Sequence, residues 1–232
     1  MKTIGLIGGM SWESTMEYYR VLNEATSEKL GGLHSAKCIL YSVDFAEIDE
    51  LQRADRWQEA AALMVKAGQS LQAVGADFLL ICTNTMHKLY DELEARVDLP
   101  LLHIADATAA AVKARGIKRV GLLGTRFTME HDFYRRRLIE KHGLDVLIPD
   151  QEDRDLVHNV IYSELCLGLV RPASRTNFIA VIERLVNAGA QGVILGCTEI
   201  ELLVQEGDCR VPTFPTTRIH AEAAVEYALK DI

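Results

Sequence analysis

The sequence lacks the features that mark membrane and secreted proteins. No apolar run approaches the roughly 20 residues that a membrane-spanning helix needs. The apolar segment near the N-terminus is shorter than that of a signal peptide, and glycines and Trp12-Glu13 interrupt it. We therefore expect a cytoplasmic protein that has no membrane partner.

Signatures of metal and nucleotide sites are missing as well. The five cysteines form no C-x-x-C pair and the seven histidines form no H-E-x-x-H motif, so we expect reduced thiols and no metal. The glycine-rich segment GLIGGMSWEST at 5–15 has neither a Walker lysine nor the G-x-G-x-x-G spacing. The sequence therefore predicts no cofactor.

Positive charge is scarce. The chain has 25 Lys and Arg against 33 Asp and Glu, which gives a net charge of -8. A protein of this sign repels a phosphate backbone, so nucleic acid is not expected as a partner. The one basic run, YRRRLIEK at 134–141, is interpreted as the solvated face of a helix.

What the sequence does contain is the pattern of an α/β fold. With 49% hydrophobic and 25% charged residues the composition is that of a globular protein. Continuous apolar runs alternate with helix-length amphipathic segments such as 56–74 and 176–189, which is typical of parallel sheets covered on both faces. The expected strands are 3–9, 38–43, 77–82, 99–104, 119–125, 145–149, 192–197 and 211–215.

The second half of the chain repeats the first. GLIGG at 5–9 recurs as GLLGT at 121–125, and GADFLLICTNT at 75–85 recurs as GAQGVILGCTE at 189–199. Similar offsets in one order predict two similar lobes. We expect each lobe to be a parallel sheet of about four strands flanked by helices, with a pseudo-twofold relation and a cleft between them. The expected lobes are 1–104, joined by 213–232, and 105–212.

The repeat also selects candidate catalytic residues, because it aligns Cys197 with Thr83. Ligands of open α/β sheets bind beyond the carboxyl ends of the strands, so these two residues are expected to flank a small molecule. The sequence predicts a helix after each, and its N-terminus would attract a carboxylate and lower the pKa of a thiol. Cys197 is therefore predicted to be a thiolate that accepts a proton, with a buried structural cysteine as the equal alternative.

Neighbouring residues receive weaker predictions. Cys82 should point away from whatever Thr83 faces, since side chains alternate along a strand, and is expected in the core. His87 and His103 could act as acid–base groups, but structural histidines are the preferred interpretation.

These residues resemble the motifs of the aspartate/glutamate racemase family, which uses no pyridoxal phosphate. Gly196-Cys197-Thr198-Glu199 matches the second motif, and Thr83-Asn84-Thr85 stands where the family has Cys-Asn-Thr. The likeness runs over nearly the full length and is nearest to bacterial L-aspartate/glutamate-specific or broad-specificity amino-acid racemases. It implies a small amino-acid substrate held near Met10, Gln52, Asn84, Thr85, Thr125, Thr198 and Glu199.

The resemblance also implies a mechanism. Cys197 would remove the α-proton of the L-enantiomer, and Thr83, or a water that it holds, would return a proton to the opposite face. A threonine hydroxyl is a far weaker acid than a thiol, so turnover should favour L substrates. The lysine that dicarboxylate-specific relatives carry near the position of Cys166 is missing.

Two other functions remain open at this stage. One is a single-thiol lyase or decarboxylase of the same superfamily, and the other is a non-catalytic amino-acid-binding protein. The sequence also leaves a homodimer open.

Overall fold

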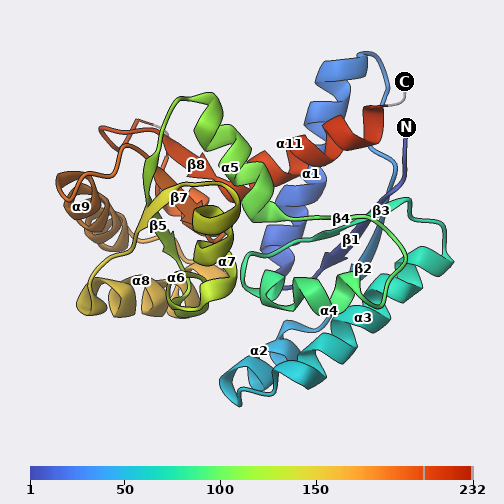
Figure 1. The fold of residues 1–232 in the computed structure, drawn as a ribbon, viewed down its shortest axis with the longest axis horizontal. Coiled ribbons are helices and arrows are strands. Elements are labelled where there is room, and N and C mark those ends of the chain that lie inside the picture. Colours follow the sequence, from blue (N-terminus) through green and yellow to red (C-terminus); the bar gives the residue numbers. More distant parts are fainter. Residues whose placement is uncertain (206, 231–232) are drawn as a thin grey trace. The chain divides into compact units, whose positions relative to one another are not determined.

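The computed structural model describes residues 1–205 and 207–230 (Figure 1). The chain forms two compact units. Unit 1 contains Met1–His103 and the chain from His220 onward, and unit 2 contains Ile104–Ile219. Each unit is built on one four-stranded parallel sheet with helices packed against it. The prediction of an α/β fold with two similar sheets is confirmed.

The two sheets have the same strand order. In unit 1 the order is β2-β1-β3-β4, and in unit 2 it is β6-β5-β7-β8. Every strand of the described residues lies within one of the apolar runs that the sequence pattern selected. Their bounds are β1 Ile4–Gly8, β2 Cys38–Ser42, β3 Phe78–Ile81, β4 Leu101–Leu102, β5 Arg119–Gly124, β6 Asp145–Leu147, β7 Val193–Gly196 and β8 Thr213–Pro215.

The helices follow the strands as the alternating pattern predicts. Unit 1 contains α1 Trp12–Leu30, α2 Phe45–Arg53, α3 Trp57–Ala73, the 3-10 helix η1 Thr85–Leu89 and α4 Tyr90–Glu94. Unit 2 contains α5 Ile104–Ala114, α6 Arg126–Glu130, α7 Asp132–Arg136, the π-helix η2 Arg137–Lys141, α8 Gln151–Ser163, the 3-10 helix η3 Leu165–Leu167, α9 Pro172–Asn187 and α10 Ile200–Leu203. The last helix, α11 Thr216–Leu229, begins in unit 2 and continues in unit 1.

The central strands of each sheet are buried on both faces. In β3, Phe78 and Leu80 pack in the cluster that holds apolar residues of α1 and α11. Leu79 and Ile81 point the other way and pack with residues of α2 and α3. Side chains alternate across a strand, so a strand covered on both faces must be apolar throughout. The same division holds in unit 2, where α8 and α9 cover one face and α5 and η2 the other.

The boundary near the C-terminus differs from the expected one. We expected residues from 213 onward to join the N-terminal lobe. In the structure β8 pairs with β7, with Thr213 in register with Val193, and unit 2 extends to Ile219. Strand pairing is a tertiary contact, and the apolar run VPTFP by itself does not say which sheet it joins.

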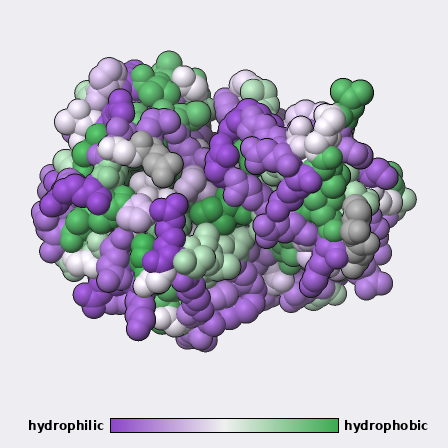
Figure 2. Space-filling model, turned by 90° about the horizontal axis from the view of Figure 1, so that it is seen from above, coloured by the Kyte–Doolittle hydropathy of each residue, from purple (hydrophilic) through white to green (hydrophobic). Residues whose placement is uncertain are grey.

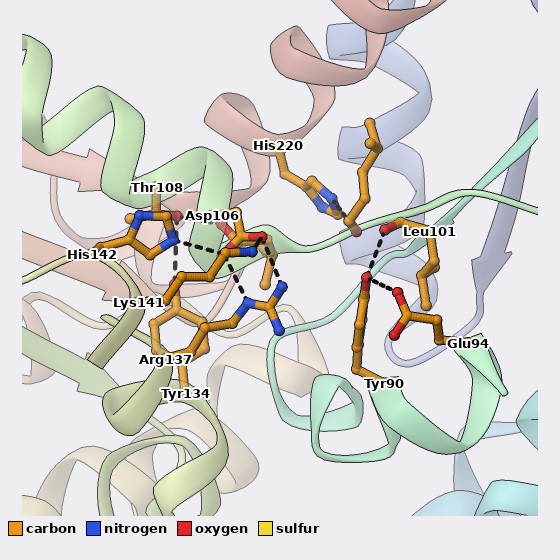
Figure 3. Close-up of polar contacts among 12 residues, drawn as sticks. Tyr90, Glu94, Leu101, Asp106, Thr108, Tyr134, Arg137, Lys141, His142 and His220 are labelled. Carbon is orange, nitrogen blue, oxygen red and sulfur yellow. Dashed lines mark hydrogen bonds and ion pairs between the residues drawn. The ribbon is translucent and has the colours of Figure 1, made fainter. Parts of the chain in front are cut away.

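The basic run at 134–141 is more than a solvated face, so that interpretation is wrong in part. Tyr134 is fully buried. Arg137 donates to both carboxylate oxygens of Asp106, at 2.7 and 2.8 Å, and Lys141 and His142 contact the same carboxylate (Figure 3). The run therefore contributes to an ion cluster that joins η2 to α5.

Hydrophilic side chains cover much of the face drawn in Figure 2. Within residues 1–205 and 207–230, every helix is too short or too polar to cross a bilayer.

Candidate active site

In unit 1 the candidate residues lie at the carboxyl ends of β1 and β3. These strands pair directly, with Ile7 in register with Ile81. Met10 follows β1, and Thr83 follows β3. The hydroxyl of Ser14 donates to the carbonyl of Cys82 at 2.9 Å and so ties the start of α1 to the turn after β3. The fold thus brings the two turns to one edge of the sheet.

The turn after β1 depends on a glycine. Gly9 has φ +90°, and a Cβ there would lie 2.2 Å from the carbonyl oxygen of Val43. A side chain would therefore clash with the chain beyond β2, in a conformation that already disfavours one. The glycine-rich segment at 5–15 is explained by this close approach.

Gln52 reaches the same edge from α2. Its side-chain amide donates to the sulfur of Met86 at 3.0 Å, and Met10 and Met86 belong to one apolar cluster. Asn84 and Thr85 are buried, whereas Thr83 is partly exposed. Five residues that the sequence selected, Met10, Gln52, Thr83, Asn84 and Thr85, therefore lie in this part of unit 1.

In unit 2 the equivalent edge carries Thr125 and Cys197. They follow Gly124 and Gly196, which are in register on the adjacent strands β5 and β7. A Cβ on Gly124 would lie 2.9 Å from the carbonyl oxygen of Gly196. The hydroxyl of Thr125 accepts the N–H of Thr128 at 3.3 Å and caps α6.

Cys197 forms a hydrogen-bonded pair with Glu199. The Cys197 thiol donates to Glu199 Oε2 at 2.9 Å, and the Thr198 hydroxyl donates to the same oxygen at 2.6 Å. Cys197 is 9% exposed and Glu199 is 4% exposed. Burying a carboxylate is unfavourable unless hydrogen bonds compensate, and these two donors supply such bonds. The turn thereby keeps a proton acceptor next to the sulfur.

The prediction that a helix N-terminus lowers the pKa of Cys197 is wrong. Burial, and then the negative charge of Glu199, raise the pKa of this thiol well above its ordinary value. The helix after Cys197 is α10, which has only four residues, so its dipole is small. The sulfur is thus a thiol that is hydrogen-bonded to a carboxylate.

The residues that precede η1 and α10 do not act as side-chain N-caps. Asn84 and Glu199 precede η1 and α10, but both have right-handed helical backbone angles and neither side chain caps its helix. A side-chain cap normally requires an extended backbone at that residue. The Glu199 carboxylate is instead committed to Cys197 and Thr198.

Three histidines of unit 1, His87, His103 and His220, form a buried cluster next to the turn that carries Thr83. The rings of His87 and His103 have centroids 4.6 Å apart, and His87 lies 5.7 Å from His220. The preferred interpretation of His87 and His103 as structural agrees with their burial. Sequence reasoning missed His220, which α11 brings back from the far end of the chain to donate to the carbonyl of Leu102 (Figure 3).

Cys82 is fully buried in the core, as predicted, and burial raises its pKa. Across the described ranges, with residues 206, 231 and 232 set aside, no three His, Cys, Asp or Glu side chains come together in a way that could hold a metal ion.

Comparison with known proteins gives one consistent family. The family model for Asp/Glu/Hydantoin racemase matches residues 7–224. A candidate Asp/Glu racemase from Yersinia pestis, known from its crystal structure, is 58% identical, with a TM-score of 0.92 over 99% of this chain and 100% of that chain. An aspartate racemase homologue from Pyrococcus horikoshii is 34% identical, with a TM-score of 0.86 over 98% and 99% of the two chains.

A third relative, the broad-specificity amino-acid racemase RacX of Bacillus subtilis, is 20% identical, and the alignment covers 96% of each chain. The chain belongs to the Asp/Glu/Hydantoin racemase family and is an amino-acid racemase, an enzyme of the isomerase class.

Proposed function

We propose that this racemase inverts the α-carbon of L-aspartate, L-glutamate or a similar small amino acid without a cofactor. Cys197 removes the α-proton, and a proton returns to the opposite face from the side of Thr83. The observation that carries the proposal is the hydrogen bond of 2.9 Å between the Cys197 thiol and Glu199. This bond supports the proposal, because it brings a carboxylate to the proton that the thiol must lose.

The first step uses Cys197 and Glu199 as one base. The thiol proton moves to the Glu199 carboxylate, and the resulting thiolate takes the α-proton and becomes a thiol again. The substrate is left as a carbanion, and the total charge of the site is unchanged. The hydroxyl of Thr198, 2.6 Å from the carboxylate oxygen, holds Glu199 in place. The resemblance placed Glu199 among the substrate-binding residues. We instead assign it the role of accepting the proton of the Cys197 thiol.

The second step is assigned to Thr83. Its hydroxyl, or a water that it holds, protonates the carbanion and recovers a proton from solvent, while the protonated Glu199 releases to solvent the proton that it took from the thiol. A threonine hydroxyl is a poor base at neutral pH, so removal of the α-proton from a D substrate is slow. The proposed binding residues are Met10, Gln52, Asn84 and Thr85 of unit 1, and Thr125 and Thr198 of unit 2.

Proton NMR in heavy water tests the proposal. The enzyme is incubated with a panel of L and D amino acids, and loss of the α-proton signal identifies the substrate and its handedness. Wild-type enzyme should exchange the α-proton of at least one small L-amino acid, and Cys197→Ser should abolish exchange.

Cys38→Ser is the matched control, because Cys38 is a half-buried thiol on β2 of unit 1. It should keep exchange near the wild-type rate. Exchange that survives in Cys197→Ser would remove the assignment of the base. Release of carbon dioxide from malonates, without exchange on any amino acid, would favour a decarboxylase instead.

A further inference from the structure

We propose that His87 is a positioning residue for Thr83. Its ring donates a hydrogen bond to the main-chain carbonyl of Thr83. This bond fixes the position from which Thr83 delivers the second proton. The inference rests on the proposed function, because it requires Thr83 to be the second proton group.

The local contacts define this role. His87 Nδ1 lies 2.8 Å from the carbonyl oxygen of Thr83, and the main-chain N–H of His87 donates to the carbonyl of Asn84 at 3.1 Å. His87 therefore binds two successive carbonyls of the turn that carries Thr83. The 3-10 helix η1 makes this possible, because it carries the ring back over the start of the turn.

Hydrogen bonding to a carbonyl fixes the tautomer of the ring. A carbonyl oxygen only accepts, so Nδ1 of His87 must carry the hydrogen. The same reasoning applies to His220, whose Nε2 lies 3.1 Å from the carbonyl oxygen of Leu102. His220 Nδ1 then accepts the hydroxyl of Tyr18 at 2.8 Å. Burial, and then His87, lower the pKa of His220 to about 3, so His220 is neutral near physiological pH.

Neighbouring rings leave His87 little freedom to move. His103 packs between His87, at 4.6 Å, and Tyr90, at 4.8 Å, measured between ring centroids. The Tyr90 hydroxyl is itself held by Glu94 at 2.8 Å and by the carbonyl of Leu101 at 3.2 Å (Figure 3). The His87 ring is thus packed among rings from the end of β4 and from α11. Because a closely packed ring cannot shift, the carbonyl that it binds is also held in place.

Position matters because proton transfer needs close geometry. A misplacement of about 1 Å can reduce the rate roughly 100-fold. Thr83 is partly exposed and follows the end of β3, so the ladder of the sheet does not itself hold its side chain. The His87 ring supplies the missing constraint.

Two substitutions of His87 separate positioning from packing. In His87→Asn the side-chain amide nitrogen occupies roughly the place of Nδ1 and can still donate to Thr83. In His87→Gln the amide nitrogen lies nearer the place of Nε2 and cannot. We expect His87→Asn to keep kcat for conversion of the L to the D enantiomer within about fivefold, and His87→Gln to lose about 10- to 100-fold in that kcat with little change in KM.

Thermal denaturation of both variants shows whether the effect is only structural. Comparable melting temperatures with different kcat values support positioning. Losses of kcat that follow the loss of melting temperature in both variants, or wild-type kcat in His87→Gln, would overturn it. Adding His87→Gln to Thr83→Cys should slow exchange of D substrates, for which the new thiol is the base, more than exchange of L substrates.

A measurement on the wild-type enzyme needs no variant and no activity. Nitrogen-15 NMR of the imidazoles should show the His87 Nδ1–H tautomer at neutral pH. The Nε2–H tautomer would contradict the inference and leave the proposed function intact. Wild-type enzyme that exchanges no amino acid would instead refute the proposed function, and this inference with it.

Discussion

Replacing Glu199 with glutamine tests the thiol–carboxylate pair. The change removes one negative charge, while the amide oxygen can still accept the hydroxyl of Thr198. The substitution should change formation of the Cys197 thiolate in two opposite ways. The charge of Glu199 is the second cause, after burial, of the raised pKa of Cys197, so the pKa of the thiol should fall. The base that takes the thiol proton during turnover is also lost.

The second effect should dominate near neutral pH. A positioned general base contributes about 10²- to 10⁴-fold to a rate, and Glu199 lies within hydrogen-bond distance of the sulfur, at 2.9 Å. We expect kcat to fall by about 10²- to 10³-fold, which corresponds to about 3 to 4 kcal/mol of activation free energy. Because the variant depends on direct ionisation of the thiol, its rate should rise with pH through the pKa of Cys197, more steeply than that of the wild type.

The assay is α-deuterium uptake by an L substrate across a range of pH, together with the ultraviolet absorbance of the thiolate. Glu183→Gln is the control, because Glu183 lies on α9 and forms an ion pair with Arg210. A Glu199→Gln enzyme as fast as wild type near neutral pH would refute the paired base. A higher thiol pKa in the variant would refute the electrostatic reasoning.

Three further changes have expected outcomes. Thr83→Cys should allow D-amino acids to exchange their α-proton, measured by NMR in heavy water, because a thiol can serve as the base on that face; no exchange would contradict the role of residue 83. Asp106→Asn should lower the free energy of unfolding, measured in urea, by about 2 to 3 kcal/mol near neutral pH, because Arg137 and its neighbours lose their common acceptor; equal stability would contradict this. Burial alone would raise the pKa of Asp106, but hydrogen bonds from Arg137, His142 and Lys141 hold it well below its usual range. The stability that the ionised carboxylate contributes is present above its unfolded-state pKa. The difference in unfolding free energy between wild type and variant should therefore narrow as the pH falls below about 4. Tyr18→Phe should lower the free energy of unfolding by about 1 to 3 kcal/mol, because Nδ1 of the buried His220 would lose its donor; an unchanged urea midpoint would contradict that contact.

Much of the fold could be predicted from the sequence, because strands buried on both faces leave a local signal. Runs such as DFLLIC and GVILGC are apolar at every position, and their recurrence at similar offsets indicates two equivalent sheets. The second unit boundary was not predictable in this way. The pairing of β8 with β7 depends on contacts between distant segments.

The candidate site could also be predicted from the sequence only in part. Aligning the repeats selected Thr83 and Cys197, since both follow the third strand of their sheet. The direction of the Cys197 pKa was missed, because it depends on how far the next helix extends and on where the Glu199 side chain turns. His220 left no signal near residue 83 in the sequence, since only the course of α11 brings it there.

The proposed mechanism depends most directly on whether the sulfur of residue 197 takes the α-proton. Mass spectrometry of an L-amino acid substrate recovered from heavy water measures this for wild type and Cys197→Ser side by side. The mechanism predicts one deuterium per substrate molecule with wild type and none with the variant. Equal incorporation by the two enzymes would contradict it.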